Sequence, residues 1–162
     1  MDTKRKRIEA LELFRSGYNC SQSVFTAFAP EIGMSRDMAL TVSAGLGGGV
    51  GRMREVCGAM TALAMLAGFC RPMEDGKDSS AKRDIYALVQ QMGEEFRQRN
   101  GSIVCRELLG LQRPEGIPQP DARTDAYYKK RPCAEIVGDA AEIACRILFE
   151  NRGTLSNGNF GA

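Results

Sequence analysis

The chain has 162 residues, of which 43% are hydrophobic and 26% charged, and its net charge is +2. This length and balance predict one globular domain and exclude disordered and fibrous classes. The basic cluster at residues 4–7 is too short for a nucleic-acid-binding face and has no aromatic residues for base stacking. We therefore expect no nucleic-acid partner.

The sequence favours a cytoplasmic location and no membrane partner. The basic cluster is followed by IEALELF, which carries glutamates where the apolar core of a secretory signal should lie. The longest uncharged stretches, Met38–Gly51 and Val56–Cys70, are shorter than the roughly 18–20 apolar residues that span a bilayer. A transmembrane helix is therefore not expected.

Apolar residues recur at helical spacing along the chain, and no stretch alternates for long enough to predict a sheet. The first predicted helix places Ile8, Leu11 and Phe14 on one side and ends at Gly17. Asn19 is expected to cap the second helix and Ser35 the third.

A glycine-rich segment, residues 45–51, follows the third helix. The fourth helix is predicted over Val56–Arg71, where alanine, leucine and methionine indicate a buried central helix that packs inside one chain or across a homodimer. Asp78 is a suitable cap for a long amphipathic fifth helix that ends near Gly101.

A short helix is predicted within residues 102–110, followed by a proline-containing connection over 112–125 and a last helix that begins near Pro132. The predicted fold class is therefore all-α, a single compact bundle of about six to seven helices. We expect one helical domain over residues 1–151 and a mobile C-terminal tail over 152–162.

The chain contains six cysteines and no histidine. Disulfides are rare in the cytoplasm, so this number favours metal binding or redox chemistry. The absence of histidine excludes a Cys–His nucleophile pair, a histidine-ligated haem and a mixed Cys/His zinc site within this chain. Four cysteines, which we call the helix-start cysteines, are predicted in the first turn of a helix: Cys20, Cys57, Cys105 and Cys133.

Unpaired backbone N–H groups at a helix start lower the pKa of a thiol. Cys57 is the strongest candidate for a reactive thiol, because it also follows the glycine-rich segment and lies near Arg52 and Arg54. We interpret the glycines as letting the backbone fold against the start of this helix and present N–H groups to sulfur. Cys70 and Cys145 lie at the end and inside of helices, so buried structural roles are expected for them.

Three functional interpretations remain open. The helix-start cysteines could form a redox site, which either holds an iron–sulfur cluster or cycles between thiols and disulfides. The same thiolates could instead bind a structural zinc ion. The gaps of 36, 47 and 27 residues lack the close pairs usual in iron–sulfur and zinc sites, which argues against a cluster. In the third interpretation the glycine-rich segment binds a nucleotide or another anion, without spelling a known phosphate-binding motif. The residues of that candidate binding site are Gly47, Gly48, Gly49, Arg52 and Arg54.

The sequence resembles the redox-active proteins named for their C_GCAxxG_C_C cysteine pattern. Cys20 is similar to the leading cysteine, and EVCGAMTAL, with Cys57, is similar to the central motif. GSIVCRELLG and KKRPCAEIV are similar to the segments that carry the last two cysteines, and the similarity extends roughly over residues 17–137. Ala62 stands where the central motif has glycine. The resemblance implies an all-helical redox-active module, either an oxidoreductase or an electron-transfer protein, with a redox partner that the sequence does not identify.

Overall fold

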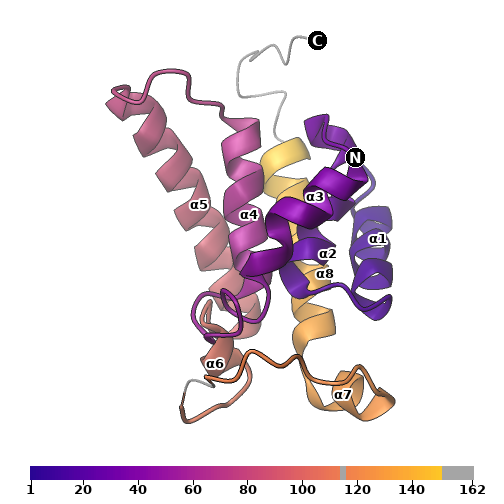
Figure 1. Ribbon diagram of the computed structural model, residues 1–162. Coiled ribbons are helices and arrows are strands. Elements are labelled where there is room, and N and C mark those ends of the chain that lie inside the picture. Colours follow the sequence, from indigo (N-terminus) through magenta and orange to yellow (C-terminus); the bar gives the residue numbers. More distant parts are fainter. Residues whose placement is uncertain (114–115, 151–162) are drawn as a thin grey trace.

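The computed structural model describes residues 1–113 and 116–150, and within them the chain forms helices and no strand (Figure 1). The α-helices are α1 (Thr3–Arg15), α2 (Cys20–Ala27), α3 (Arg36–Ser43), α4 (Gly58–Cys70), α5 (Ser79–Asn100), α6 (Cys105–Leu108), α7 (Asp125–Lys130) and α8 (Cys133–Ala144). The shorter helical elements are η1 (Pro30–Ile32), η2 (Ala44–Leu46) and the π-helical η3 (Cys145–Phe149). The predicted all-α fold is confirmed, and α7 is an addition to the predicted helices.

Side chains and glycines define the helix ends where the sequence predicts them. The Asn19 side chain accepts from the Gln22 N–H and the Gln22 side chain accepts from the Asn19 N–H, so α2 begins with a capping box. Ser35 and Asp78 cap α3 and α5 through their side-chain oxygens. Gly101, with a φ of 90°, ends α5 in the left-handed conformation.

The hydrophobic core lies where α2, α4 and α8 meet. α2 packs mainly against α4, α1 packs mainly against α8, and α5 lies along α4 and α8 (Figure 1). Eight of the 13 residues of α4 are buried, as predicted for a central helix. Fully burying a Phe or Leu side chain contributes about 1.5–3 kcal/mol. The largest fully buried side chains include Phe14, Phe25, Phe28, Phe96, Leu63 and Leu66.

The expectation that Ile8 lies on the buried side of α1 is wrong. Ile8 is 54% exposed, whereas Lys6 is 4% exposed. The buried face of α1 consists of Lys6, Ala10 and Phe14, which recur at every fourth position. The Lys6 ammonium group is accommodated there because it donates to a backbone carbonyl of α2 and pairs with two glutamates.

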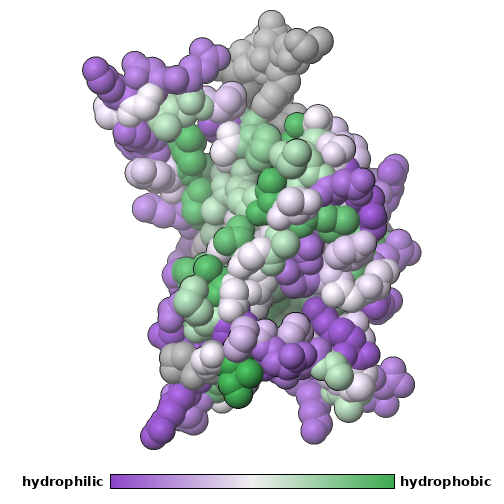
Figure 2. Space-filling model, in the orientation of Figure 1, coloured by the Kyte–Doolittle hydropathy of each residue, from purple (hydrophilic) through white to green (hydrophobic). Residues whose placement is uncertain are grey.

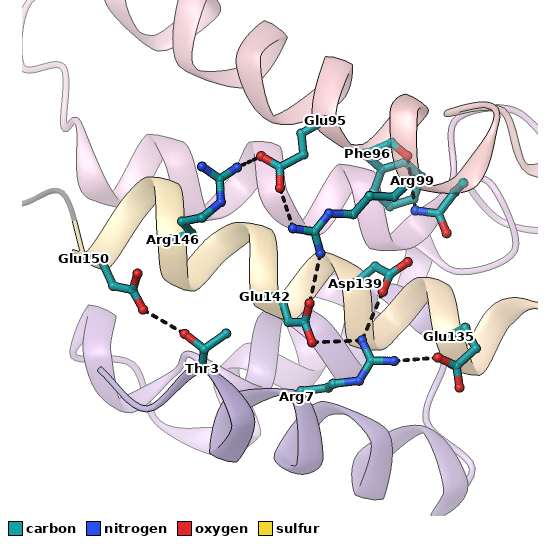
Figure 3. A network of polar contacts seen from close by, with 11 residues as sticks. Thr3, Arg7, Glu95, Phe96, Arg99, Glu135, Asp139, Glu142, Arg146 and Glu150 are labelled. Atoms are coloured by element: carbon teal, nitrogen blue, oxygen red, sulfur yellow. Dashed lines mark hydrogen bonds and ion pairs between the residues drawn. The ribbon is translucent and has the colours of Figure 1, made fainter.

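Charged side chains join α1, α8 and α5 along one side of the molecule (Figure 3). Arg7 of α1 lies 3.0 Å from Asp139 and 3.2 Å from Glu142, both on α8. Glu142 also lies 2.9 Å from Arg99 of α5, so one carboxylate connects the three helices. Single exposed ion pairs contribute only about 0–1 kcal/mol, so the network mainly fixes how these helices are oriented.

On the face shown in Figure 2, hydrophobic residues gather over the middle of the molecule, while hydrophilic residues cover the lower end, where α6 and α7 lie in Figure 1. Met38 and Val42 of α3 are among the exposed hydrophobic residues. No helix in the described part of the chain has the length and apolar character to cross a membrane.

The buried apolar side chains of the described residues form one cluster that extends along the chain from Ala10 to Phe149. The tail predicted over residues 152–162 lies outside the described residues.

Candidate functional site

Each helix-start cysteine lies at the beginning of a helix, as the sequence predicts. Cys20, Cys105 and Cys133 are the first residues of α2, α6 and α8. Cys57 is the residue that caps α4, one position before the helix begins. All four are reduced thiols in this structure.

The four helix-start cysteines line one cavity of about 290 Å³. Its wall is built from the glycine-rich segment, α6, and the connection that leads to α7, which meet at the lower end of the molecule in Figure 1. The other two cysteines, Cys70 and Cys145, are buried in the hydrophobic core instead. The fold therefore brings together thiols that are separated by 36, 47 and 27 intervening residues in sequence.

Cys20 carries the most acidic thiol of the cavity. The interaction of its sulfur with the neighbouring Cys57 thiol is the main reason that the pKa of Cys20 falls to about 6. The backbone N–H groups of Gly48, Ser21 and Cys20 itself add to the effect, and burial opposes it. Hydrogen bonds to a thiolate favour the ionised form, so Cys20 is a thiolate at neutral pH.

Cys57 was the expected reactive thiol, and its pKa shifts in the opposite direction to that of Cys20. The pKa of Cys57 is raised by its interaction with the Cys20 sulfur and by burial of the thiol. Its sulfur receives a backbone hydrogen bond from Ala59, whereas three backbone N–H groups stabilise Cys20. Backbone donors therefore add to the effect of the neighbouring thiol and favour ionisation of Cys20.

The other two helix starts do not acidify their thiols either. Burial raises the pKa of Cys105, although the Arg54 guanidinium donates to its sulfur over 4.0 Å and acts in the opposite direction. Burial and the nearby Cys20 charge raise the pKa of Cys133 to about 12. Desolvation outweighs the helix N-terminus at these positions, so the expected acidification holds for Cys20 alone.

The glycine-rich segment forms a left-handed turn beside the cysteines. Five successive residues, Gly48 to Arg52, have positive φ angles between 56° and 73°. L-residues lose about 1–2 kcal/mol each in this conformation, which explains why most of these positions are glycine. The turn presents the Gly48 N–H to the Cys20 sulfur. The interpretation that the glycines direct N–H groups to sulfur therefore holds for Cys20 and not for Cys57.

The absence of a side chain at two glycines lets the backbone lie close to two of the cysteines. A Cβ atom at Gly49 would lie 2.6 Å from the Cys105 Cβ and 2.7 Å from the Glu55 nitrogen. A Cβ atom at Gly58 would lie 2.6 Å from the Cys20 sulfur. Both separations are too short for non-bonded atoms, so glycine is required at both positions.

Four arginines line the cavity: Arg52, Arg54, Arg123 and Arg131. We call them the cavity arginines. Asp121, the one carboxylate among the lining residues of the described chain, lies 2.9 Å from Arg131, 3.2 Å from Arg52 and 3.7 Å from Arg54.

The fourth cavity arginine, Arg123, is held by aromatic rings and by a backbone carbonyl. Its guanidinium lies 4.6 Å from the ring centres of Phe14 and Tyr127 and donates to the Tyr18 carbonyl. The cavity therefore carries an excess of positive charge around its thiols.

Of the five residues predicted to bind an anion, Gly47, Gly48, Arg52 and Arg54 line the cavity. The neighbouring amides are already engaged, because the N–H groups of residues 50, 52, 54 and 55 donate to carbonyls of residues 46–49. Beside the Gly48 N–H, which faces the Cys20 sulfur, the arginine side chains are the positive groups that line the cavity.

Sequence reasoning missed Asp121, Arg123, Tyr127 and Arg131. All four lie in or just after the proline-containing connection, which has no helical spacing to indicate what it faces. The sequence does contain a local signal for these residues. The run YYKKR lies immediately before Pro132 and Cys133, so aromatic and basic residues are concentrated beside a helix-start cysteine.

The helix-start cysteines share a cavity but do not form a metal-binding group. Within residues 1–113 and 116–150, no three side chains of Cys, Asp or Glu are placed to hold one ion together. A structural zinc site needs four such ligands, and iron–sulfur clusters are bound by several thiolates. The predicted metal ligation is therefore not confirmed, and the iron–sulfur cluster and the zinc ion stay predictions.

Comparison with known proteins places this arrangement in a family context. The family model described as "Putative redox-active protein (C_GCAxxG_C_C)" matches residues 18–147, a range that includes all four helix-start cysteines. No curated protein and no solved structure matches the chain.

Proposed function

The chain belongs to the C_GCAxxG_C_C family of redox-active proteins, and on this basis we propose that it acts as a dithiol–disulfide oxidoreductase through Cys20 and Cys57. Cys20 is the attacking thiolate and Cys57 is the thiol that completes the disulfide. The observation that carries the proposal is the closeness of the two cysteines: both line one cavity, a Cβ atom at Gly58, the residue after Cys57, would lie 2.6 Å from the Cys20 sulfur, and each thiol is the main cause of the pKa shift of the other.

The proposed reaction consumes a disulfide substrate. The Cys20 thiolate attacks one sulfur of the substrate, forming a mixed disulfide and releasing the other half as a thiolate. Cys57 then gives its proton to the released thiolate and attacks the Cys20 sulfur. A Cys20–Cys57 disulfide forms, and the second half of the substrate leaves as a thiolate that takes a proton from water. Two electrons pass from the dithiol to the substrate, and an external dithiol restores the reduced protein by the reverse exchange.

The ionisation states suit these two steps. A thiolate with a pKa of about 6 is the predominant form at neutral pH and leaves readily when attacked, which favours reversible exchange. Cys57 holds its proton until Cys20 has reacted, since the Cys20 charge is then neutralised in the mixed disulfide. The raised pKa values of Cys105 and Cys133 keep these thiols protonated at neutral pH.

Thiol counting and peptide mapping test the proposal. Anaerobically purified, reduced protein treated with one equivalent of 2-hydroxyethyl disulfide should lose two thiols per chain. Digestion and mass spectrometry should then find Cys20 linked to Cys57, and dithiothreitol should reverse the change. The Cys57→Ser variant should stop at a mixed disulfide on Cys20, while the control Cys70→Ser should still form the Cys20–Cys57 link.

Two results would contradict the proposal. One is a Cys20→Ser variant that keeps the reversible loss of two thiols. The other is stoichiometric iron with sulfide, or zinc, in the anaerobic protein that is lost on replacing the helix-start cysteines, because the thiols would then serve as metal ligands.

A further inference from the structure

We propose that the disulfide reduced in this cavity is a small molecule that carries carboxylates, bound by the cavity arginines. This inference deepens the proposed function and rests on it, since it names the substrate class of the same site. It depends on the charge, the internal carboxylate and the size of the cavity.

The charge of the cavity favours an anion. Among the described lining residues, four arginines and one aspartate are charged, and the Cys20 thiolate adds one negative charge. Within this described lining, positive groups therefore outnumber negative ones around the attacking sulfur. Charge of one sign inside a cleft raises the local concentration of oppositely charged ligands, so an anionic disulfide is favoured over a neutral or cationic one.

Asp121 shows that a carboxylate fits among these arginines. Its two oxygens lie 2.9 Å from Arg131 and 3.2 Å from Arg52, which are distances of charge-assisted hydrogen bonds. Asp121 lies on the connection between α6 and α7, outside any helix. A substrate carboxylate would meet the same guanidinium groups with the same chemistry.

Arg123 supplies a donor that the protein leaves unused. Its Nη1 atom is buried and has no hydrogen-bond partner among the described residues. A buried donor without an acceptor is unfavourable, so a ligand acceptor that reaches it removes this penalty. The rings of Phe14 and Tyr127 hold the guanidinium in place, so it is oriented before the ligand arrives.

The cavity volume of about 290 Å³ limits the size of the substrate. Sites for small organic ligands begin at roughly 300 Å³. One arm of a small disulfide fits this space, with its sulfur at Cys20 and its carboxylate at the arginines.

Three disulfides of similar length and different charge test the inference. They are 3,3′-dithiodipropionate, which is anionic, 2-hydroxyethyl disulfide, which is neutral, and cystamine, which is cationic. Rate constants for their reaction with reduced protein are divided by the rate constants with free 2-mercaptoethanol, which removes their intrinsic reactivity. The anionic disulfide should react at least tenfold faster than the neutral one, and cystamine should be slowest.

Variants assign this preference to the arginines. Arg123→Gln and Arg131→Gln should each reduce the anionic-to-neutral ratio by about threefold or more. Arg83→Gln, on the exposed face of α5, is the matched control and should leave the ratio unchanged. Taking the ratio within each variant removes any change in the ionisation of Cys20.

The outcomes separate this inference from the proposed function. Equal relative rates for the three disulfides would overturn the inference and leave the dithiol function standing. If none of the disulfides reacts, calorimetry on Cys20→Ser decides. Binding of dithiodipropionate without binding of cystamine would keep the ligand class and contradict the redox role, whereas no binding of either would overturn both.

Discussion

Cys20 and Cys57 show how two neighbouring thiols at helix starts acquire different chemistry. Both meet the condition that usually lowers the pKa of a cysteine, a place at the beginning of a helix. Cys20 receives three backbone N–H groups and the Cys57 thiol, whereas Cys57 receives a backbone N–H from Ala59. The number of donors that reach each sulfur, and not the helix start alone, selects the thiolate.

The pH dependence of alkylation follows from this difference. The pKa of Cys20 is lowered to about 6, so its reactive thiolate appears as the pH rises through 6. From pH 5 to pH 7 the thiolate fraction increases from about 10% to about 90%, and alkylation by iodoacetamide should accelerate by about an order of magnitude and then level off. Cys133 and Cys145, with pKa values of about 12 and about 11, should react far more slowly.

Peptide mass spectrometry of reduced protein after short exposure to iodoacetamide measures this order. Labelling of Cys57 before Cys20 at pH 6 would contradict the assignment of the thiolate.

Replacing Cys57 tests whether its thiol ionises Cys20. Cys57→Ala removes the donor and should raise the pKa of Cys20 by about one unit or more. Cys57→Ser retains a donating hydroxyl and should keep the pKa of Cys20 closer to 6. The absorbance of the thiolate near 240 nm, titrated against pH, reports both. A pKa that is the same in the two variants would show that the backbone N–H groups act alone.

At the scale of elements, the glycine-rich segment positions two cysteines at once. Its left-handed turn brings the Gly48 N–H to Cys20, and the missing side chain of Gly49 makes room for Cys105. This one segment therefore connects α2 and α6, which are far apart in sequence, to the same cavity.

Gly49→Ala should lower the free energy of unfolding by about 2–4 kcal/mol, because the added Cβ meets Cys105 and the Glu55 nitrogen and the φ of 73° disfavours L-residues. Gly68→Ala in α4 is the control, since a Cβ there meets no atom within 4 Å. It should raise the free energy of unfolding by about 0.5–1 kcal/mol through helix propensity. Urea unfolding followed by circular dichroism measures both. Similar stability of Gly49→Ala and the original chain would show that the turn can rearrange.

The elements that the sequence predicts are those with local signals. Asn19, Ser35 and Asp78 are caps that act within a few residues of their own position, so their helices are placed correctly. α7 was missed because it has six residues and no buried face, although Thr124 caps it in the expected manner. Ile8 was misplaced because apolar character alone does not reveal that Lys6 finds partners in the core.

At the scale of the whole molecule, the cavity depends on contacts that no local pattern reveals. Arg123 donates to the Tyr18 carbonyl, 105 residues away, and Arg52 pairs with Asp121, 69 residues away. The sequence identifies the four helix-start cysteines, because their helix starts are local features. Their pKa values depend on burial and on neighbours from other elements, so the sequence alone does not rank Cys57 against Cys20.

Asp121 links the connection before α7 to the body of the molecule. Replacing it therefore tests how the charge of the whole cavity affects the preference for an anionic disulfide. Asp121→Asn removes the carboxylate that occupies Arg52 and Arg131 and adds one positive charge to the excess in the cavity. The ratio of the rate constants for dithiodipropionate and 2-hydroxyethyl disulfide should rise several-fold at low salt. The ratio should fall toward that of the original chain in 0.5 M NaCl, because salt screens exposed charges.

A different result would assign Asp121 another role. If Asp121→Asn accelerates both disulfides equally, the aspartate holds the connection over the cavity and controls access without selecting charge. Such an equal effect should be independent of salt, because opening of the cavity admits neutral and anionic substrates alike. The salt dependence of the ratio therefore separates recognition of charge from control of access.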